Sequence, residues 1–356
     1  MVILMKLSEL ETPALILDLD VMEQNMAKMD SLLAGTQMRL RPHYKSNKCP
    51  AIAHLQLAAG AKGICCSKLS EAEDLAFSGI EDILIANQIA DRGKIARLAS
   101  LSRCCRLTVC VDNAENIQDL QNACALQDAQ LHCLIEYEIG MNRCGVSEPA
   151  QVLALAEQLS ACPNLTYDGI QAYAGNLAHE EDAAVRQRKS DEVEQRLREL
   201  KAYLIEHGKP AREFSGTSTG TVAMRQKQTV YTEVQAGSYL FMDMAYRKVG
   251  APFSHSLFVL ASVMDKRDDA VITDAGAKSV SVDQKTPAFF GYEDLPVEMS
   301  EEHSAVYAPL PLRVGDRMKL IPGHCCTTIN LHDWLYFVRG DKVVDRVPIV
   351  GRGHSL

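Results

Sequence analysis

The stretch Arg41-Pro42-His43-Tyr44-Lys45-Ser46-Asn47-Lys48 follows a short apolar run and places a lysine just after an expected strand. A lysine in that position can hold an aldehyde cofactor through a Schiff base. An isolated lysine is more often a solvated surface residue. The residues elsewhere in the chain therefore decide between a cofactor site at Lys45 and an ordinary surface position.

The composition favours a large globular protein with small-molecule ligands. The chain has 356 residues, 47% of them apolar, and this length favours one large domain plus a smaller one. The formal net charge of -9, without a clustered Lys/Arg stripe, predicts no nucleic-acid partner. No apolar run reaches the roughly 18 residues of a membrane span, and the apolar start at residues 1–6 is too short for a secretory signal. We therefore expect no membrane partner.

The cysteines indicate a reducing compartment. Twelve cysteines are spread through apolar segments, with adjacent pairs at 65–66, 104–105 and 325–326. This pattern is unlike the disulfide framework of a small secreted protein. We therefore expect a cytoplasmic protein with reduced thiols.

Strand-like and helix-like segments alternate through the first two thirds of the chain. After an opening strand at 14–18 and a helix at 21–33, strands are predicted at residues 38–43, 63–66, 83–86, 107–111, 131–136, 167–173, 213–215 and 232–235. Helices are predicted between them at residues 51–59, 69–77, 94–102, 114–126, 150–159 and 184–207. Eight alternating units predict an α/β fold with an N-terminal (β/α)8 TIM-like barrel.

The remainder of the chain is rich in strand-forming residues. Strands are predicted at residues 256–263, 270–273, 318–321, 334–338 and 343–349, separated by Gly, Pro and Asp turns. We predict a barrel over residues 14–245 and a C-terminal all-β domain, formed by residues 1–13 plus 246–356.

Several unusual residues follow the predicted barrel strands, where barrel enzymes place their sites. Arg143 lies in Gly140-Met141-Asn142-Arg143-Cys144-Gly145-Val146 after the fifth strand. Tyr173 and His179 follow the sixth strand, in and just after Gln171-Ala172-Tyr173-Ala174-Gly175. Each residue has an alternative interpretation without a ligand: Arg143 as an ordinary loop arginine, Tyr173 as a core tyrosine and His179 as a solvated histidine.

The loops after the seventh and eighth strands suit a phosphate group. The candidate residues are Gly216, Thr217, Ser218, Thr219 and Gly220 in one loop, and Gly237, Ser238 and Tyr239 in the other. Such loops offer backbone amides and hydroxyls, and glycine lets the chain approach an anion closely. A single loop of this kind is usually only a flexible turn, but barrels use these two positions for phosphate.

A candidate metal pair lies near the C-terminus. His324 and Cys326 are two residues apart, so on an extended strand they share a face while Cys325 points away. Such a pair could hold a divalent metal with open positions left for other ligands. The alternative is a buried thiol beside an incidental histidine.

Taken together, these motifs resemble the D-threonine aldolase and D-serine dehydratase family of pyridoxal-phosphate (PLP) enzymes, which have an alanine-racemase-type fold. The resemblance rests on Arg-Pro-His-x-Lys, Gly-Met-x-Arg-x-Gly, Gln-Ala-Tyr-x-Gly and Pro-Gly-His-Cys-x-Thr-x-Asn-Leu-His-Asp-Trp, in that order over nearly the whole chain. It implies a barrel followed by a β domain that the opening strand joins. It also implies a homodimer.

The resemblance gives roles to the cofactor residues. Lys45 is the Schiff-base lysine, Arg143 approaches the phenolic oxygen of PLP, and Tyr173 touches its pyridine ring. The two glycine-containing loops bind its phosphate. His179 lies where the aldolases carry a histidine, and it is a candidate base.

The resemblance also implies a metal held by His324 and Cys326 over the cofactor. The aldolases typically carry an aspartate at the position of Cys326, whereas a cysteine there resembles the dehydratases. A thiolate ligand favours zinc, and a carboxylate would suit manganese or magnesium. The departure at Cys326 leaves the metal and the reaction open.

We expect an aldolase that cleaves a 3-hydroxy-D-amino acid, of the D-threonine or 3-hydroxy-D-aspartate type, to glycine and an aldehyde. The alternative is a dehydratase that converts such a substrate to a keto acid and ammonia. A racemase and a non-catalytic PLP carrier are weaker alternatives, because neither uses the His-x-Cys pair. Candidates for binding the carboxylate of the substrate are Arg41, Arg225, Arg247 and Lys278.

Overall fold

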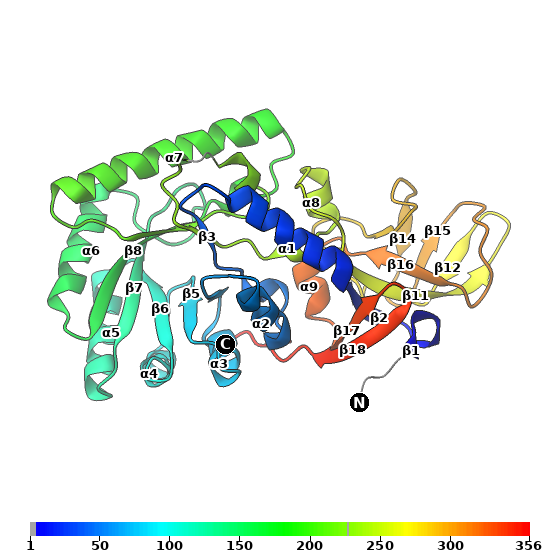
Figure 1. The fold of residues 1–356 in the computed structure, drawn as a ribbon, viewed down its shortest axis with the longest axis horizontal. Helices are drawn as coiled ribbons and strands as arrows, with labels where there is room; N and C mark the ends of the chain where they lie inside the picture. Colours follow the sequence, from blue (N-terminus) through cyan, green and yellow to red (C-terminus); the bar gives the residue numbers. More distant parts are fainter. Residues whose placement is uncertain (1–4, 226–227) are drawn as a thin grey trace. The chain divides into compact units, whose positions relative to one another are not determined.

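A computed structural model describes residues 5–225 and 228–356 (Figure 1). The first four residues of the apolar start lie outside the described residues. The chain divides into two compact units. The barrel unit consists of Leu32–Lys45, Ile52–Gly237 and His354–Leu356, and the β unit of Met1–Ser31, Ser46–Ala51 and Ser238–Gly353.

The predicted (β/α)8 TIM-like barrel is confirmed. In the described part of the barrel unit, eight parallel strands pair in the order β3, β10, β9, β8, β7, β6, β5, β4. Their bounds are β3 (Arg39–Leu40), β4 (Ile64–Cys66), β5 (Asp82–Ile85), β6 (Arg106–Val111), β7 (Leu131–Glu136), β8 (Leu165–Ala172), β9 (Glu213–Gly216) and β10 (Glu233–Val234). A parallel bridge between His43 and Cys65 joins the chain beyond β3 to β4, and so closes the sheet.

Helices follow the strands as predicted. They are α2 (Pro50–Ala58), α3 (Leu69–Phe77), α4 (Arg92–Leu101), α5 (Ala114–Leu126), α6 (Pro149–Ala161) and α7 (Ala183–Glu206). Figure 1 shows α4, α5 and α6 outside strands β6, β7 and β8. Side chains cap three of these helices, because Asp91, Asn113 and Asp182 each accept a backbone N–H of the first turn.

Four neighbouring strands supply an apolar cluster inside the barrel unit. Cys65, Leu84, Cys110 and Leu134 come from β4, β5, β6 and β7 and pack together in full or nearly full burial. Burial raises the pKa of the Cys65 thiol to about 12. This cysteine is therefore a neutral packing residue rather than a nucleophile.

The β unit contains a mixed sheet. Its strands pair in the order β1, β18, β17, β2, β11, β12, β15, β14, and β16 pairs with both β11 and β13. The bounds are β1 (Met5–Lys6), β2 (Ala14–Asp18), β11 (Leu257–Lys266), β12 (Val271–Thr273), β13 (Ala288–Phe289), β14 (Val297–Met299), β15 (Ser304–Val306), β16 (Arg317–Ile321), β17 (Trp334–Arg339) and β18 (Lys342–Pro348). The five strands predicted after residue 251 are all present.

The opening strand belongs to the β unit, as the resemblance implies. Strand β2 lies antiparallel to β11 and parallel to β17. Because its backbone hydrogen bonds go to these strands, residues 14–18 group with the β unit. The compact units therefore differ from the predicted ranges of 14–245 and 1–13 plus 246–356, and those boundaries stay a prediction.

The β unit also contains helices, namely most of α1 (Leu19–Leu33), α8 (Met244–Lys248) and α9 (Cys325–Ile329). The expectation of an extended strand through residues 324–326 is wrong, because α9 begins at Cys325. Strand β16 ends before Pro322 and Gly323, and His324 is the extended residue that precedes the helix. One tertiary and one local hydrogen bond hold the turn. Cys325 N donates to Asp243 Oδ2, far away in sequence, at 2.9 Å, and Thr328 Oγ1 donates to the nearby His324 carbonyl at 2.8 Å.

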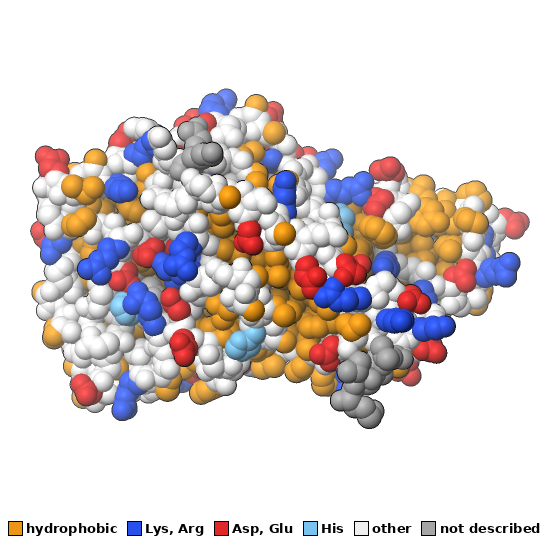
Figure 2. Space-filling model, viewed as in Figure 1, with side chains coloured by type: hydrophobic (Ala, Val, Ile, Leu, Met, Phe, Trp, Pro, Cys, Tyr) orange, Lys and Arg blue, Asp and Glu red, His pale blue; other side chains and the backbone are white. Residues whose placement is uncertain are grey.

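The described residues contain no helix that combines the length and the apolar character needed to cross a membrane. On the face shown in Figure 2, basic and acidic side chains are interspersed over the described residues.

Candidate active site

Lys45 lies at the carboxyl end of its barrel strand, where a barrel enzyme places its site. It belongs to the short 3-10 helix Tyr44–Ser46, directly after β3, and its side chain is exposed. The Lys45 ammonium lies 5.9 Å from the ring centroid of Tyr173, which follows β8. The structure therefore brings these two predicted cofactor residues together.

His43 fixes the backbone that carries Lys45. The Lys45 N–H donates to His43 Nδ1 at 3.3 Å, and His43 Nε2 lies 3.3 Å from Ser67 Oγ. Because Nδ1 accepts this backbone N–H, the ring proton is assigned to Nε2. The buried imidazole thus connects the chain after β3 to the chain after β4.

Arg143 lies in a loop that carboxylates organise. Glu138 Oε1 accepts the backbone N–H of Gly140 at 2.7 Å and of Asn142 at 2.8 Å. The Arg143 guanidinium is half-exposed and lies 3.7 Å from Glu136 Oε1 at the end of β7. Burial raises the pKa of Glu136, although its hydrogen bond from Gln88, at 2.5 Å, and the charge of Arg143 oppose this shift.

The loop after β9 has the chemistry of an anion site. The hydroxyls of Thr217 and Thr219 are buried and have no hydrogen-bond partner within the described residues. Thr217 also has a positive φ of 64°, which a threonine rarely adopts. Two unsatisfied buried hydroxyls fit a bound phosphate that would accept their hydrogens. The observed loop therefore fits the phosphate of PLP.

The two glycines of this loop are required by packing. A Cβ atom at Gly216 would lie 2.1 Å from the carbonyl oxygen of Ala172, and one at Gly220 would lie 2.1 Å from that of Ala178. Ser218, which lies between them, donates its N–H to the hydroxyl of Thr221 at 3.1 Å. The loop is therefore held by close backbone contacts rather than left flexible.

The loop after β10 crosses from one unit to the other. Gly237 ends the barrel unit, whereas Ser238 and Tyr239 begin a segment of the β unit. The ring of Tyr239 is fully buried and packs on Phe253, with 5.6 Å between the centroids. Ser238 Oγ lies 3.6 Å from Cys326 Sγ. Their predicted contact with phosphate stays a prediction.

His179 is an exposed residue between two helical segments. It follows the 3-10 helix Gly175–Leu177 and precedes α7 by three residues. Its neighbour Glu180 pairs with Lys189 at 3.2 Å. The position allows contact with a ligand in solution, and its role as a base stays a prediction.

The predicted metal pair comes together at the start of α9. Cys326 lies close enough to His324 to raise the pKa of its imidazole, although the two residues lie on a strand-to-helix junction rather than on a strand. Cys326 Sγ also lies 3.4 Å from Ser46 Oγ. A neighbouring imidazole and thiol form a donor set that suits zinc.

A carboxylate stands on the other side of this imidazole. Asp283 Oδ2 lies 3.0 Å from His324 Nδ1. Burial disfavours the charged imidazole, but Cys326 and then Asp283 raise the pKa of His324 to about 9. Burial likewise disfavours the Asp283 carboxylate, but hydrogen bonds from Ser281, His324 and Thr327 lower its pKa overall. The surroundings therefore favour an ion pair in the absence of metal.

The described residues contain no group of three or more His, Cys, Asp or Glu side chains that could hold a metal. His324 and Cys326 therefore offer two ligands. A metal on two protein ligands keeps positions for water and substrate, as catalytic sites do.

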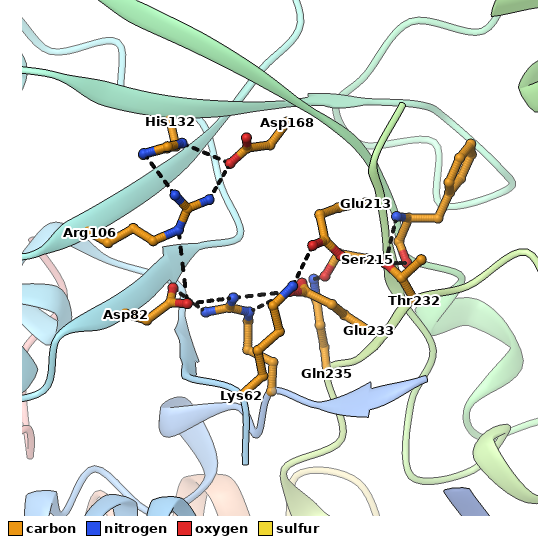
Figure 3. A network of polar contacts seen from close by, with 12 residues as sticks. Lys62, Asp82, Arg106, His132, Asp168, Glu213, Ser215, Thr232, Glu233 and Gln235 are labelled. Carbon is orange, nitrogen blue, oxygen red and sulfur yellow. Dashed lines mark hydrogen bonds and ion pairs between the residues drawn. The ribbon is translucent and has the colours of Figure 1, made fainter. Parts of the chain in front are cut away.

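The four candidates for a substrate carboxylate are already paired with acidic residues. Arg41 is buried and contacts Asp82 at 2.8 Å and Glu233 at 3.0 Å; Figure 3 shows these two acids. The other three pairs are Arg225 with Glu194, Arg247 with Glu293, and Lys278 with Glu301 and Glu302. Arg41 is therefore a structural residue of the barrel.

Sequence reasoning missed the residues that support the predicted ones. Asp283 precedes His324 by 41 residues, and Asp243 precedes Cys325 by 82. Gln88 lies in the loop after β5, whereas Glu136 ends β7, and β6 separates these two strands. None of them lies in a motif, and only the fold brings them together.

Comparison with known proteins identifies the family of this chain. The family described as the N-terminal domain of alanine racemase matches residues 17–245, and a putative serine dehydratase domain matches residues 256–338. A D-threonine aldolase from Arthrobacter sp. is 40% identical over 98% of this chain and 94% of its own length. The chain belongs to the D-threonine aldolase and D-serine dehydratase family.

Further relatives support membership in this family. A 3-hydroxy-D-aspartate aldolase from Paracoccus denitrificans (strain Pd 1222) is 37% identical over 97% of this chain and 93% of its own length. The crystal structure of D-threonine aldolase from Filomicrobium marinum has a TM-score of 0.94 and 35% identity, and 98% of each chain is covered. The predicted family and fold are therefore confirmed over nearly the whole chain.

Proposed function

We propose that this protein is a PLP- and divalent-metal-dependent aldolase that cleaves a 3-hydroxy-D-amino acid to glycine and an aldehyde. The observation that carries the proposal is the 40% identity to a D-threonine aldolase over nearly the full length of both chains. The closeness of Cys326 to His324 supports a metal, and the position of Lys45 supports the cofactor.

The barrel unit would hold the cofactor. Lys45 would bind its aldehyde carbon, while the Thr217 and Thr219 hydroxyls would donate to its phosphate. Arg143 would place a positive charge beside its phenolic oxygen, and Tyr173 would pack on its ring. When bound, PLP supplies an electron sink for the bond broken at Cα of the substrate.

The β unit would hold the metal through His324 and Cys326. When bound, a divalent ion supplies a Lewis acid for the β-hydroxyl of the substrate. The thiol favours zinc over manganese or magnesium, because sulfur ligands suit softer ions.

Cleavage between Cα and Cβ requires a base for the proton of the β-hydroxyl. We propose His179 for this role, since it follows the Gln-Ala-Tyr-x-Gly segment and is exposed. A neutral imidazole is suited to accepting a proton near pH 7.

The alternative function is a dehydratase that releases ammonia and a keto acid from a D-3-hydroxy amino acid. It is favoured by the sulfur ligand Cys326 and by the serine dehydratase domain that matches residues 256–338, which include the metal pair. In this reaction Lys45 would remove the α proton, and no base would be needed at the β-hydroxyl.

A product assay distinguishes the two reactions. Purified protein would be incubated with PLP, zinc or manganese, and D-threonine or 3-hydroxy-D-aspartate. We expect glycine and an aldehyde product in equal amounts, with no turnover of the L-isomers. Ammonia and a keto acid would assign the dehydratase instead, and the absence of both product pairs would contradict the proposed function.

We also propose a cytoplasmic homodimer. The support for the compartment is the buried, reduced thiols of Cys65, Cys110 and Cys133, which need no oxidising environment. The support for the dimer is membership of the family, and analytical ultracentrifugation of the purified protein would test it.

A further inference from the structure

We propose that Asp283 is the positioning residue of the metal site: it orients His324 so that the opposite ring nitrogen faces the metal. This inference rests on the metal-binding part of the proposed function, and not on which reaction the protein catalyses. Its basis is the contact of both Asp283 carboxylate oxygens with one nitrogen of His324, at 3.0 and 3.3 Å from Nδ1.

The contact decides which nitrogen of His324 carries the proton. An ionised carboxylate can only accept hydrogen bonds, so Nδ1 must be the protonated nitrogen. In the neutral imidazole, Nε2 then carries the lone pair that binds a metal. Histidine ligands of metals are commonly oriented by a carboxylate in this way.

The position of Asp283 indicates that it orients His324 and does not itself bind the metal. The two ring nitrogens of an imidazole point in different directions. A carboxylate within hydrogen-bonding distance of Nδ1 therefore does not reach a metal on Nε2. This agrees with the absence, among the described residues, of any metal-like group of three or more side chains.

Asp283 is itself held in place by hydroxyl groups. Ser281 Oγ donates to Asp283 Oδ1 at 2.5 Å, and Thr327 Oγ1 lies 3.1 Å from the same oxygen. The carboxylate is therefore fixed on both sides, although its side chain is about half exposed. A residue that only filled space at the surface would not need these contacts.

The same hydroxyls tie the Asp283 segment to α9. Thr327 Oγ1 lies 2.7 Å from Ser281 Oγ, and Ser281 N donates to Thr328 Oγ1 at 3.0 Å. Thr327 and Thr328 belong to the helix that carries Cys326. The segment thus holds both proposed ligands in one rigid arrangement.

Zinc titration of the full-length, metal-stripped protein tests the inference. Affinity would be measured by competition with a chromophoric chelator, with PLP bound and its absorbance recorded. We expect Asp283→Ala to weaken zinc binding about 10- to 100-fold. Asp283→Asn should weaken zinc binding less than Asp283→Ala does, because asparagine keeps an oxygen acceptor for the Nδ1–H of His324. The PLP absorbance and the thermal unfolding midpoint should stay close to those of the native protein.

A matched control removes a carboxylate from the same unit without touching the site. Asp265 is half-exposed and pairs with Arg267 at 3.0 Å, so Asp265→Ala should bind zinc as the native protein does. Native zinc affinity in Asp283→Ala would overturn the inference. Loss of an oxygen neighbour from the X-ray absorption spectrum of bound zinc in that variant would overturn it too, because Asp283 would then be a ligand.

Two outcomes separate this inference from the proposed function. If His324→Ala binds zinc as tightly as the native protein, the proposed metal pair fails and the inference fails with it. If His324 is required and Asp283 sets the affinity, the inference stands even when the product assay yields neither product pair.

Discussion

At the scale of single residues, Lys45 combines a fixed backbone with an extended side chain. Its N–H donates to the buried His43, whereas its amine extends to 5.9 Å from the ring centroid of Tyr173. A lysine that must react repeatedly with a carbonyl group benefits from this combination, because the backbone sets the position and the side chain retains its reach.

Replacing Lys45 with alanine tests its assignment. We expect Lys45→Ala to abolish the visible absorbance of the lysine-bound cofactor and to lower turnover by several orders of magnitude. Lys48→Ala is the matched control, since the Lys48 amine is used in a hydrogen bond to the Gly351 carbonyl at 3.1 Å. An unchanged spectrum for Lys45→Ala would remove this residue from its role. Loss of the absorbance in the control alone would point to Lys48 instead.

At the scale of elements, the strands of the barrel were predictable because their apolar runs are short and regularly separated by helical periodicity. The start of α9 was not predictable from the sequence. The run Cys325-Cys326-Thr327-Thr328-Ile329 consists of residues that favour strands, so no local signal predicts a helix. Asp243 and Ser281, both far away in sequence, stabilise the helix: Asp243 accepts the N–H of Cys325, and Ser281 N donates to Thr328 Oγ1.

The candidate site likewise contains residues that the sequence predicts and residues that it does not. Lys45, Arg143 and the two glycine-containing loops are recognisable because each follows a predicted strand in a motif. Asp283 lies between predicted strands and has no motif of its own. Only the hydrogen bond to His324 identifies it, and that contact depends on tertiary structure.

Gly323 controls how the chain enters α9. A Cβ atom there would lie 1.8 Å from the carbonyl oxygen of Lys285 and 2.9 Å from that of Ser281. Both oxygens belong to the backbone on either side of Asp283, so Gly323→Ala must displace this segment. We expect zinc affinity to fall at least 10-fold, with a loss of about 1–3 kcal/mol in the free energy of unfolding.

A second glycine provides the control for this prediction. Gly93 lies in α4, where the nearest atom to a new Cβ is a carboxylate oxygen of Asp91 at 3.2 Å. Gly93→Ala should keep native zinc affinity and be neutral or slightly stabilising, because alanine favours a helix. Native zinc affinity in Gly323→Ala would show that the close contact is not needed for the metal pair.

At the scale of the whole barrel unit, a chain of contacts between polar and charged side chains joins all eight strands. Each strand of the sheet contributes one member, which lies in the strand or beside it, and Figure 3 shows most of them. In order of contact they are His132, Asp168, Arg106, Asp82, Arg41, Glu233, Lys62 and Glu213. Sequence reasoning could not find this chain of contacts, because its members are spread over about 190 residues and each looks like an isolated surface charge.

Glu233 is the most buried acid of this chain of contacts, with 3% of its side chain exposed. It contacts Arg41 at 3.0 Å and Lys62 at 2.7 Å. Burial opposes its ionisation, but these two cations lower its pKa from 4.5 to about 2. Because the folded pKa is the lower one, ionised Glu233 contributes stability that is fully present above about pH 4.5. This contribution is lost as the pH falls towards 2.

We therefore expect Glu233→Gln to lower the free energy of unfolding at pH 7 by about 3 kcal/mol, since it leaves Arg41 and Lys62 partly uncompensated in a buried site. The difference between the native protein and the variant should shrink between pH 4.5 and 2, as the native carboxylate becomes protonated. Urea unfolding followed by circular dichroism at several pH values measures both effects. Glu192→Gln is the control, because this exposed residue of α7 only faces Arg188 at 3.8 Å, and exposed pairs contribute little. Equal unfolding midpoints for Glu233→Gln and the native protein at pH 7 would show that the buried charges do not stabilise the barrel.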